Sequence, residues 1–182
     1  FSQNSADMVA LADGTFIVTW QSYNQDGDQG GVFVQKYSAG GEALSEEILV
    51  NTYTTSSQSN PAVTALDNGG YVISWDSTYQ DGSGEGVYIQ AFDADNQKVG
   101  TEQSVNTYTN STQYNSAITA LQDGSYVVSW DSYGQDGNGY GVYAQRFSST
   151  GEKLGDEFLV NTATSGSQYR SSITGLEDGG FI

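Results

Sequence analysis

The chain has 182 residues, enough to build one ordinary domain with a sizeable core. It carries 22 acidic and 5 basic residues, and its formal net charge of −17 argues against nucleic acid or an anionic membrane surface as a partner. It has no cysteine and no histidine, which excludes disulfide and thiol chemistry and removes the commonest general base and metal ligand. No apolar run approaches the roughly 20 residues that span a bilayer, so membrane insertion is not expected.

A period of 55 residues runs through the whole chain without insertion or deletion. It divides the chain into a partial first repeat (1–50), two full repeats (51–105 and 106–160) and a partial fourth repeat (161–182). The chain begins at Phe1 without a visible signal peptide, and both ends fall inside the repeat, so we expect a piece of a longer polypeptide. The residues that recur in register include Trp20, Trp75 and Trp130; Asp26, Asp81 and Asp136; Gln35, Gln90 and Gln145; and Asn51, Asn106 and Asn161.

Each repeat predicts four short strands separated by turns, shown here for the second. The segment 61–66 (PAVTAL) is a first strand, followed by the tight turn DNGG and by a β-branched and aromatic strand at 71–75 (YVISW). An acidic, glycine-rich loop leads to an alternating strand at 86–92 (GVYIQAF), and a weaker strand follows at 101–105 (TEQSV). No apolar stripe of helical spacing is present, so the sequence predicts an all-β fold.

Four antiparallel strands in about 40–55 residues are the size of one β-propeller blade. We therefore expect tandem β-propeller-like blades, with an open β-repeat array or a solenoid as the alternative. About three and a third repeats are present, and a ring needs roughly four or more blades. Flanking repeats of the same chain could complete a ring, copies of the chain could associate, or the array could stay open.

The strings LQDGSYVVSW, QDGNGYGVYAQRF and VNT in 121–162 resemble tandem repeats of long secreted or surface-displayed bacterial proteins. Such repeats often accompany calcium-binding nonapeptide tracts and type I secretion signals, neither of which is present in this sequence. The resemblance implies an extracellular or cell-surface location and an adhesive or structural role.

The acidic, glycine-rich loop allows two interpretations. Calcium prefers closely spaced carboxylate and carbonyl oxygens in a glycine-bent loop, although the regular spacing of an EF-hand is missing here. Alternatively, the aspartate of each Asp-Gly pair bonds its own backbone and simply turns the chain, which is the favoured reading. Calcium is the only cofactor that the sequence suggests, and its candidate ligands are Asp26, Asp28, Asp76, Asp81, Asp131 and Asp136.

The same loops also offer exposed aromatic rings beside amide groups, the mixture that sugar sites favour. Repetition of such a weak site would give avidity for surface glycans. The candidate ligand-binding residues are Tyr23, Gln25, Tyr79, Gln80, Tyr133 and Gln135. In contrast, the recurring tryptophans are expected to pack between blades, and the glutamines at 35, 90 and 145 to be buried against backbone groups.

Catalysis is not expected from the repeat alone. Sialidases bind their acidic sugar with three arginines, whereas this chain has only Arg146 and Arg170. Two carboxylates could serve a glycosidase, but an active site is normally a unique constellation and these groups recur in every repeat. The sequence therefore predicts a non-catalytic structural or adhesive repeat protein of a bacterial surface, filament or matrix, with a multivalent lectin as the alternative.

Overall fold

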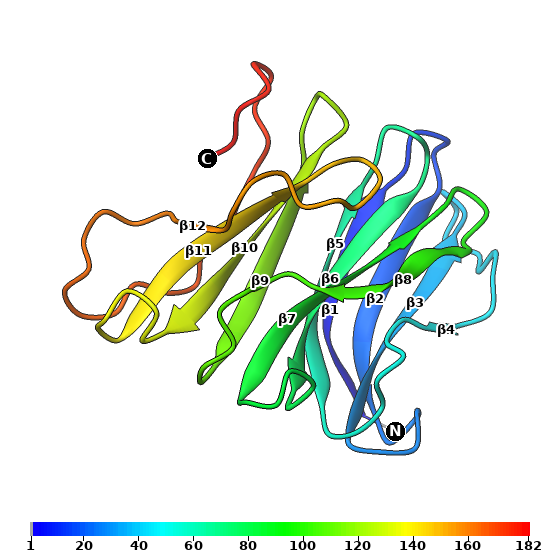
Figure 1. The fold of residues 1–182 in the computed structure, drawn as a ribbon. Helices are drawn as coiled ribbons and strands as arrows, with labels where there is room; N and C mark the ends of the chain where they lie inside the picture. Colours follow the sequence, from blue (N-terminus) through cyan, green and yellow to red (C-terminus); the bar gives the residue numbers. More distant parts are fainter. Residues whose placement is uncertain (1) are drawn as a thin grey trace.

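A computed structural model describes residues 2–182, in which the chain forms twelve β-strands and no helix (Figure 1). The strands make three four-stranded antiparallel sheets, one after another along the chain. This confirms the prediction of an all-β fold built from propeller-like blades.

Blade 1 holds β1 (Gln3–Ala10), β2 (Phe16–Tyr23), β3 (Gly30–Tyr37) and β4 (Ile48–Leu49). Blade 2 holds β5 (Gln58–Ala65), β6 (Tyr71–Thr78), β7 (Glu85–Phe92) and β8 (Lys98–Ser104), and blade 3 holds β9 (Gln113–Ala120), β10 (Tyr126–Tyr133), β11 (Tyr140–Phe147) and β12 (Phe158–Leu159).

The first strand of each blade is the inner one, and β5 lies between β1 and β9 (Figure 1). Each inner strand contains an irregularity in its pairing, where Ser5, Asn60 or Asn115 takes a positive φ of 49°, 50° or 54°. Gln58 and Ser59 pair with Ser77 and Asp76 on the far side of the irregularity, so β5 begins at Gln58, earlier than the predicted segment 61–66. Pro61 cannot donate to the ladder, and a bulge tolerates it.

Each blade has two different faces, because side chains alternate along its strands. The aromatic face of blade 2 carries Tyr71, Ile73 and Trp75 of β6 opposite Phe92, Gln90 and Tyr88 of β7. Its aliphatic face carries Val72, Ser74 and Asp76 opposite Ala91, Ile89 and Val87. Blades 1 and 3 repeat this arrangement at the equivalent positions.

The blades pack with the aromatic face of one on the aliphatic face of the blade before it. Ile17, Val32 and Val34 of blade 1 share a core with Trp75 and Tyr88 of blade 2. The same contact joins blades 2 and 3, where Val72, Val87 and Ile89 meet Trp130 and Tyr143. The expectation that the tryptophans pack between blades is confirmed for Trp75 and Trp130, which are fully buried.

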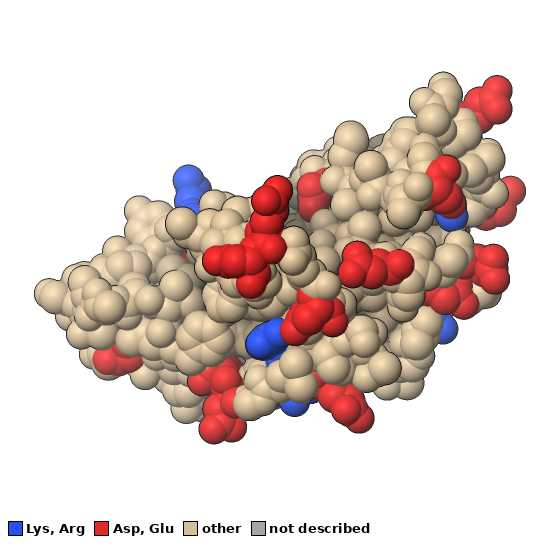
Figure 2. All heavy atoms as spheres, turned by 90° about the horizontal axis from the view of Figure 1, so that it is seen from above, with Lys and Arg blue, Asp and Glu red and all other residues tan. Residues whose placement is uncertain are grey.

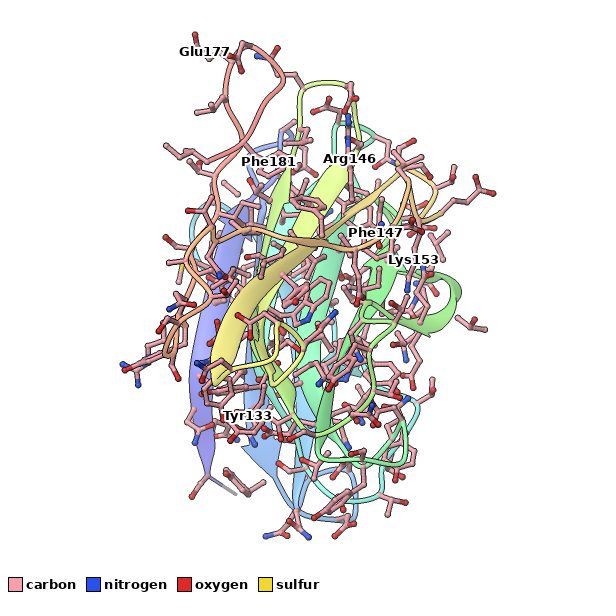
Figure 3. The ribbon with its side chains drawn as sticks, turned by 60° about the vertical axis from the view of Figure 1, so that its left-hand side comes forward. Tyr133, Arg146, Phe147, Lys153, Glu177 and Phe181 are labelled. Carbon is pink, nitrogen blue, oxygen red and sulfur yellow. The ribbon has the colours of Figure 1, made fainter. Side chains whose placement is uncertain are left out.

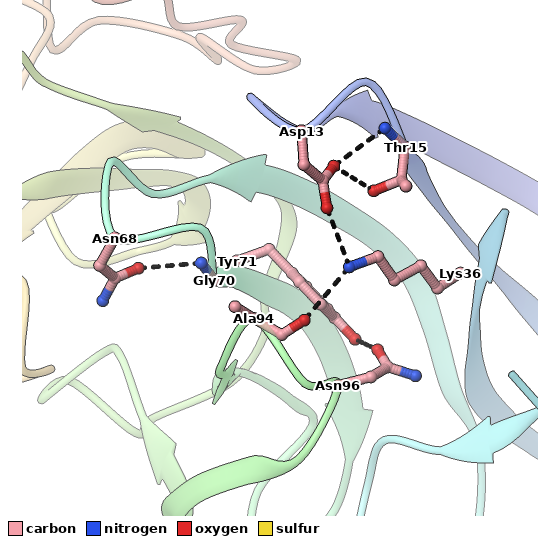
Figure 4. Close-up of polar contacts among 8 residues, drawn as sticks. All are labelled: Asp13, Thr15, Lys36, Asn68, Gly70, Tyr71, Ala94 and Asn96. Carbon is pink, nitrogen blue, oxygen red and sulfur yellow. Dashed lines mark hydrogen bonds and ion pairs between the residues drawn. The ribbon is translucent and has the colours of Figure 1, made fainter. Parts of the chain in front are cut away.

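Polar contacts join the tops of blades 1 and 2 (Figure 4). The Lys36 ammonium donates to Asp13 at 3.4 Å and to the Ala94 carbonyl of the neighbouring blade at 3.1 Å. Within blade 2, the Tyr71 hydroxyl donates to the buried Asn96 side chain. Burial raises the pKa of Tyr71 well above its ordinary value, and the charge of Asp93 adds to the shift.

The last residues lie against blade 3 as the inner strand of a further blade would. The Arg170 amide donates to Asp131, as the Asn115 amide donates to Asp76 one repeat earlier. The Gly175 amide donates to the Thr119 hydroxyl, as the Ala120 amide donates to Thr64. The segment ends in a hairpin in which Gly175 pairs with Phe181.

The surface is predominantly acidic. Figure 2 shows Asp and Glu scattered over the face in view, with only a few Lys and Arg among them. Residues 2–182 include no helix that is long and apolar enough to cross a membrane.

Candidate functional site

A pocket of about 450 Å³ opens where the inner strands of the three blades meet. We call it the axial pocket. Its lining is polar, and it comes from the bulges of the inner strands and from the segment that follows blade 3. The lining residues are Ser5, Ala6, Asn60, Pro61, Asn115, Ser116, Arg170 and Ser171.

Two buried aspartates lie behind this lining and link neighbouring blades. Asp76 Oδ2 accepts hydrogen bonds from the Asn60 side chain at 2.9 Å and from the Asn115 backbone amide at 3.0 Å. Asp131 accepts from the Asn115 side chain at 3.0 Å and from the Arg170 amide at 2.9 Å. Asn115 therefore bridges the two aspartates, and both Asn60 and Asn115 take the left-handed backbone conformation that asparagine tolerates.

Blade 2 adds a carboxyl group that the other repeats lack. Glu85 of β7 pairs with Thr78, and Asp76 of β6 pairs with Val87, so the two acids are diagonal neighbours on the aliphatic face. Such neighbours have their Cβ atoms roughly 7 Å apart. At the position of Glu85 the other repeats have Gly30 and Tyr140. The Asp76–Glu85 pair is therefore a unique feature of the junction between blades 2 and 3.

The surroundings raise the pKa of both acids. Burial raises the pKa of Asp76 to about 7, Glu85 adds to the shift, and the hydrogen bonds from Asn60 and Asn115 oppose it. Burial also raises the pKa of Glu85 above its usual range. Asp76 is 1% exposed, and its Oδ1 atom has no hydrogen-bond partner in the structure. One carboxyl oxygen of the pair is thus buried without a hydrogen-bond partner and can carry a proton.

A cluster of tyrosines lies beside the axial pocket, around the lower end of blade 3, where Figure 3 labels Tyr133. Tyr140 meets Tyr114, Tyr133 and Tyr169 edge to face, with ring centroids 5.5, 5.0 and 6.4 Å apart. Tyr114 directly precedes Asn115 and Tyr169 directly precedes Arg170, so two of these tyrosines are the chain neighbours of residues that line the pocket. Burial raises the pKa of Tyr114 to about 12, and Tyr140, Asp131 and Glu85 add to the shift.

The predicted glycan-binding residues lie at the hairpin tips of the three blades. Tyr23, Tyr79 and Tyr133 are exposed, by 38%, 62% and 47% of their surfaces. The neighbouring glutamines are engaged within their own blades, because each donates to a glutamate. These pairs are Gln25 with Glu47, Gln80 with Glu102 and Gln135 with Glu157. Only Tyr133 belongs to the cluster beside the axial pocket.

The six predicted metal ligands do not come together. Asp76 and Asp131 lie in the sheets, whereas Asp26, Asp81 and Asp136 lie in the hairpin loops. In each loop the aspartate Oδ1 accepts an amide two residues on, as at Asp81 and Ser83, and Gly82 follows with a φ of +94°. Asp28 instead accepts from the Ser56 amide. Across residues 2–182, no group of three acidic side chains is arranged to hold a metal ion.

The expectation that the recurring glutamines are buried against backbone groups holds for two of the three. Gln90 and Gln145 are buried and donate to backbone carbonyls, for example from Gln90 to Val99 at 3.0 Å, whereas Gln35 is only half-buried and donates to the Ser45 carbonyl. Asn106 accepts from the Val87 amide and donates to the Tyr108 carbonyl, so its side chain closes the turn after β8.

Sequence reasoning missed Glu85, Tyr114, Tyr140, Tyr169 and Arg170 as site residues. The signal was present in the 55-residue alignment, at positions where the repeats differ. Glu85 stands where the others have Gly30 and Tyr140, and Tyr114 and Tyr169 stand where the first two repeats have Asn4 and Ser59. Attention to the repeated residues selected the turns and the core instead.

No known family model matches the chain, and no curated protein matches it in sequence. Solved structures share the fold at low sequence identity. A thermostable family-43 glycoside hydrolase aligns with 96% of this chain and 62% of its own, with a TM-score of 0.59 and 12% identity. The α-L-arabinanase of Penicillium chrysogenum in complex with arabinobiose aligns with 95% of this chain and 49% of its own, with a TM-score of 0.56 and 17% identity. The Hadza microbial sialidase Hz136 aligns with 88% of this chain and 37% of its own, with a TM-score of 0.62 and 10% identity.

These similarities place the chain among propeller-type folds, and it spans about 37–62% of the length of the three structures. They contradict the prediction of a non-catalytic structural or adhesive protein, together with its lectin alternative, because the proteins that share the fold are glycoside hydrolases and a sialidase. The prediction that the chain is not an enzyme is contradicted by the same finding. Its argument, that the same acids recur in every repeat, overlooked Glu85.

Proposed function

We propose that the chain contributes to a glycan-processing propeller, in which a carbohydrate enters the axial pocket and the Asp76–Glu85 pair supplies acid–base chemistry. The observation that supports this most directly is the carboxyl pair itself. It occurs once in the chain, its Asp76 is hydrogen-bonded to Asn60 and Asn115 of the axial-pocket lining, and the pKa of both members is raised.

Glycoside hydrolysis needs one carboxylic acid to protonate the leaving oxygen and one carboxylate to assist the attack on the sugar. The pKa of Asp76, about 7, keeps it largely protonated in mildly acidic solution, whereas Glu85 is only half-buried and stays in contact with solvent. Asp76 is accordingly the proton donor, through its unpartnered Oδ1, and Glu85 is the carboxylate. Because the Asn60 side chain and the Asn115 backbone amide both bind Asp76 Oδ2, the Asn60 side chain turns aside when the glycan enters.

Charge favours a neutral glycan as the substrate. The net charge of −17 repels acidic sugars, and Arg170 is the only cation that lines the axial pocket within the described residues. Among the structures that share the fold, an arabinanase, an α-L-arabinofuranosidase and a xylanase are named for neutral pentose glycans. We therefore propose arabinose- or xylose-containing glycans as the substrate class.

The test is turnover of aryl arabinofuranosides and xylosides, and release of reducing ends from arabinan and xylan. Glu85→Gln and Asp76→Asn should each lower kcat by about 10²- to 10⁴-fold, the usual contribution of a general acid or base. The pH profile of kcat/KM should be bell-shaped, and Asp76→Asn should remove the fall in rate as pH rises through about 7.

The chain supplies its own matched controls. Asp131→Asn changes the equivalent acid of blade 3, which has Tyr140 instead of a glutamate across the sheet, and should lower kcat far less than Asp76→Asn does. Glu85→Tyr installs the residue that blade 3 carries at this position, so the fold tolerates it while activity is lost. Absence of turnover on all four substrates, or full activity of Glu85→Gln, would refute the proposed function.

We further propose an extracellular location, in keeping with the resemblance to repeats of secreted bacterial proteins. A polymeric pentose glycan is met outside the cell, and a strongly acidic surface suits salty surroundings. Fractionation of the source cells tests this, since a protein confined to the cell interior would contradict it. Calcium stays a prediction, and a melting temperature unchanged by chelation would argue against it.

A further inference from the structure

The chain contains two Asn-Gly pairs, Asn68-Gly69 and Asn138-Gly139, and both asparagines are exposed in turns. In such a pair the backbone nitrogen of the glycine can attack the side-chain carbonyl carbon of the asparagine, because glycine has no Cβ to hinder the approach. The attack expels ammonia and closes a succinimide ring, which water then opens to aspartate or isoaspartate. The two pairs differ in the hydrogen bonds that hold their reacting groups.

The reacting groups of the first pair are restrained. The Gly69 amide, which would supply the attacking nitrogen, donates to the Leu66 carbonyl at 3.1 Å. The Asn68 side-chain oxygen accepts from the Gly70 amide at 2.9 Å (Figure 4). Both hydrogen bonds must break before the side chain of Asn68 can turn toward the Gly69 nitrogen, so deamidation is slowed at this turn.

The reacting groups of the second pair carry no such restraint. Asn138 is exposed in the hairpin between β10 and β11, where its backbone amide donates to Asp136 Oδ1 at 3.0 Å. Its side-chain amide group makes no hydrogen bond to any of residues 2–182. Within the same residues, the Gly139 amide donates to no protein atom. The attacking nitrogen and the group that it attacks can therefore approach each other without loss of a hydrogen bond.

The position of Asn138 has a structural role in the other two blades. Asp28 Oδ2 accepts from the Ser56 amide at 2.8 Å, and Ser83 Oγ accepts from the Ser111 amide at 3.0 Å. Each bond joins the hairpin between the second and third strands of a blade to the linker that follows the same blade. A side-chain oxygen at this position thus holds the linker in place.

Blade 3 has the corresponding linker but lacks this bond. Gly166 stands at the repeat position of Ser56 and Ser111 and takes the same left-handed backbone, with a φ of 82° beside 63° and 68°. The hairpin reaches this linker, since a Cβ added at Gly139 would lie 2.8 Å from the Gly166 carbonyl oxygen. Among residues 2–182, however, the Gly166 amide has no hydrogen bond to Asn138.

We propose that Asn138 is a site of spontaneous deamidation, and that the aspartate formed there binds the Gly166 amide as Asp28 binds the Ser56 amide. In the first step the Gly139 nitrogen bonds to Asn138 Cγ and the Cγ–Nδ2 bond breaks, and the proton of the Gly139 amide leaves with Nδ2 as ammonia. Water then adds to one carbonyl of the succinimide and restores an open chain with a new carboxylate.

The product binds the linker more strongly than the original residue does. A charged oxygen is a better acceptor for a backbone amide than the neutral oxygen of an asparagine side chain. The reaction therefore gives blade 3 the carboxylate that blade 1 already carries as Asp28. The inference does not depend on the proposed catalysis.

Incubation of the full chain in mildly alkaline buffer, followed by peptide mass spectrometry, tests the reaction. Alkali favours loss of the proton from the attacking amide. Asn138 should be converted roughly fivefold or more faster than Asn68, in keeping with the hydrogen bonds that restrain Asn68. Ammonia release and isoaspartate at position 138 should accompany the conversion.

Asn138→Ser is the matched control for the reaction, because it installs the residue that blade 2 carries at this position. It keeps the hairpin but has no side-chain amide to lose, so the fast phase of ammonia release should disappear. Absence of conversion at Asn138, conversion of Asn68 at an equal or higher rate, or an unchanged fast phase in Asn138→Ser would overturn the proposed site.

Hydrogen exchange of the backbone amides tests the bond that the aspartate forms. Asn138→Asp should slow exchange at the Gly166 amide roughly fivefold relative to the freshly prepared original chain. Asp28→Asn is the reverse change and should speed exchange at the Ser56 amide, because it weakens the acceptor in blade 1. Unchanged exchange at Gly166 in Asn138→Asp, or at Ser56 in Asp28→Asn, would overturn the proposed bond.

Discussion

Blades 1 and 2 carry the same pattern of residues in different surroundings. Trp75, Tyr71 and Ile73 of blade 2 lie beneath blade 1 and are essentially inaccessible, whereas Phe16 and Val18 of blade 1 are half-buried. Blade 2 also carries Asp76 where blade 1 has Gln21, and Glu85 where blade 1 has Gly30. The comparison separates what the repeat specifies, which is the sheet, from what position in the stack adds, which is burial and altered acidity.

The largest expected difference lies at the equivalent tryptophans. Trp75→Ala should lower the free energy of unfolding by about 3–5 kcal/mol, because it leaves a cavity between two blades. Trp20→Ala should cost clearly less, since the open side of blade 1 lets neighbouring groups and water fill the space. Urea unfolding of the two variants measures both values, and equal losses would show that the two positions do not differ in effective burial.

The second difference concerns pH. The folded-state pKa of Asp76 is about 7, above the ordinary value of 3.8, so its favourable contribution is fully present below pH 4 and is lost as pH rises through 7. The loss is on the order of 4 kcal/mol for a shift of this size. Asp76→Asn should flatten the fall in stability between pH 4 and pH 7.5.

Unfolding curves at the two pH values test this expectation. Glu85→Gln provides the comparison, because it removes a charge that raises the pKa of Asp76 and should move the fall to lower pH. If Asp76→Asn keeps the full pH dependence of the free energy of unfolding, that dependence originates in other titratable groups.

The smallest expected difference is at Tyr71, where blade 1 has Phe16. Tyr71→Phe leaves the ring stacked on Phe92 but removes the donor to the buried Asn96 side chain (Figure 4). Loss of one buried hydrogen bond should cost about 1–2 kcal/mol. Phe16→Tyr is the reverse change and should be close to neutral, because the Phe16 ring is partly exposed; thermal unfolding of the two variants compares them.

The strands and the blade architecture could be predicted because they depend on alternation, turns and a repeated period. The alternation in GVYIQAF is a local property, and it placed β7 within one residue of its observed bounds. The bulge at Asn60 could not be predicted in this way, since it depends on contacts with Asp76 and the neighbouring blade. The fourth strand also differs between copies, from seven residues in β8 to two in β4 and β12.

The candidate site was largely beyond sequence reasoning for a related physical reason. Asp76 was selected as a metal ligand because of its chemistry and its distance along the chain from Asp81. Strand pairing instead places it diagonally opposite Glu85, which lies beyond the loop. The altered acidity of the pair arises from burial between blades, and this becomes visible only once the blades are stacked.

The uniform junction between blades has a consequence for how such a chain can change its length. Excision of residues 51–105 would bring the aliphatic side of blade 1 directly against the aromatic side of blade 3, which is the pairing that each already makes. Whole repeats can therefore be gained or lost in evolution without redesigning any contact surface. The catalytic candidate Glu85 would disappear with that single unit, so a shortened descendant would keep the blade architecture without the proposed Asp76–Glu85 pair.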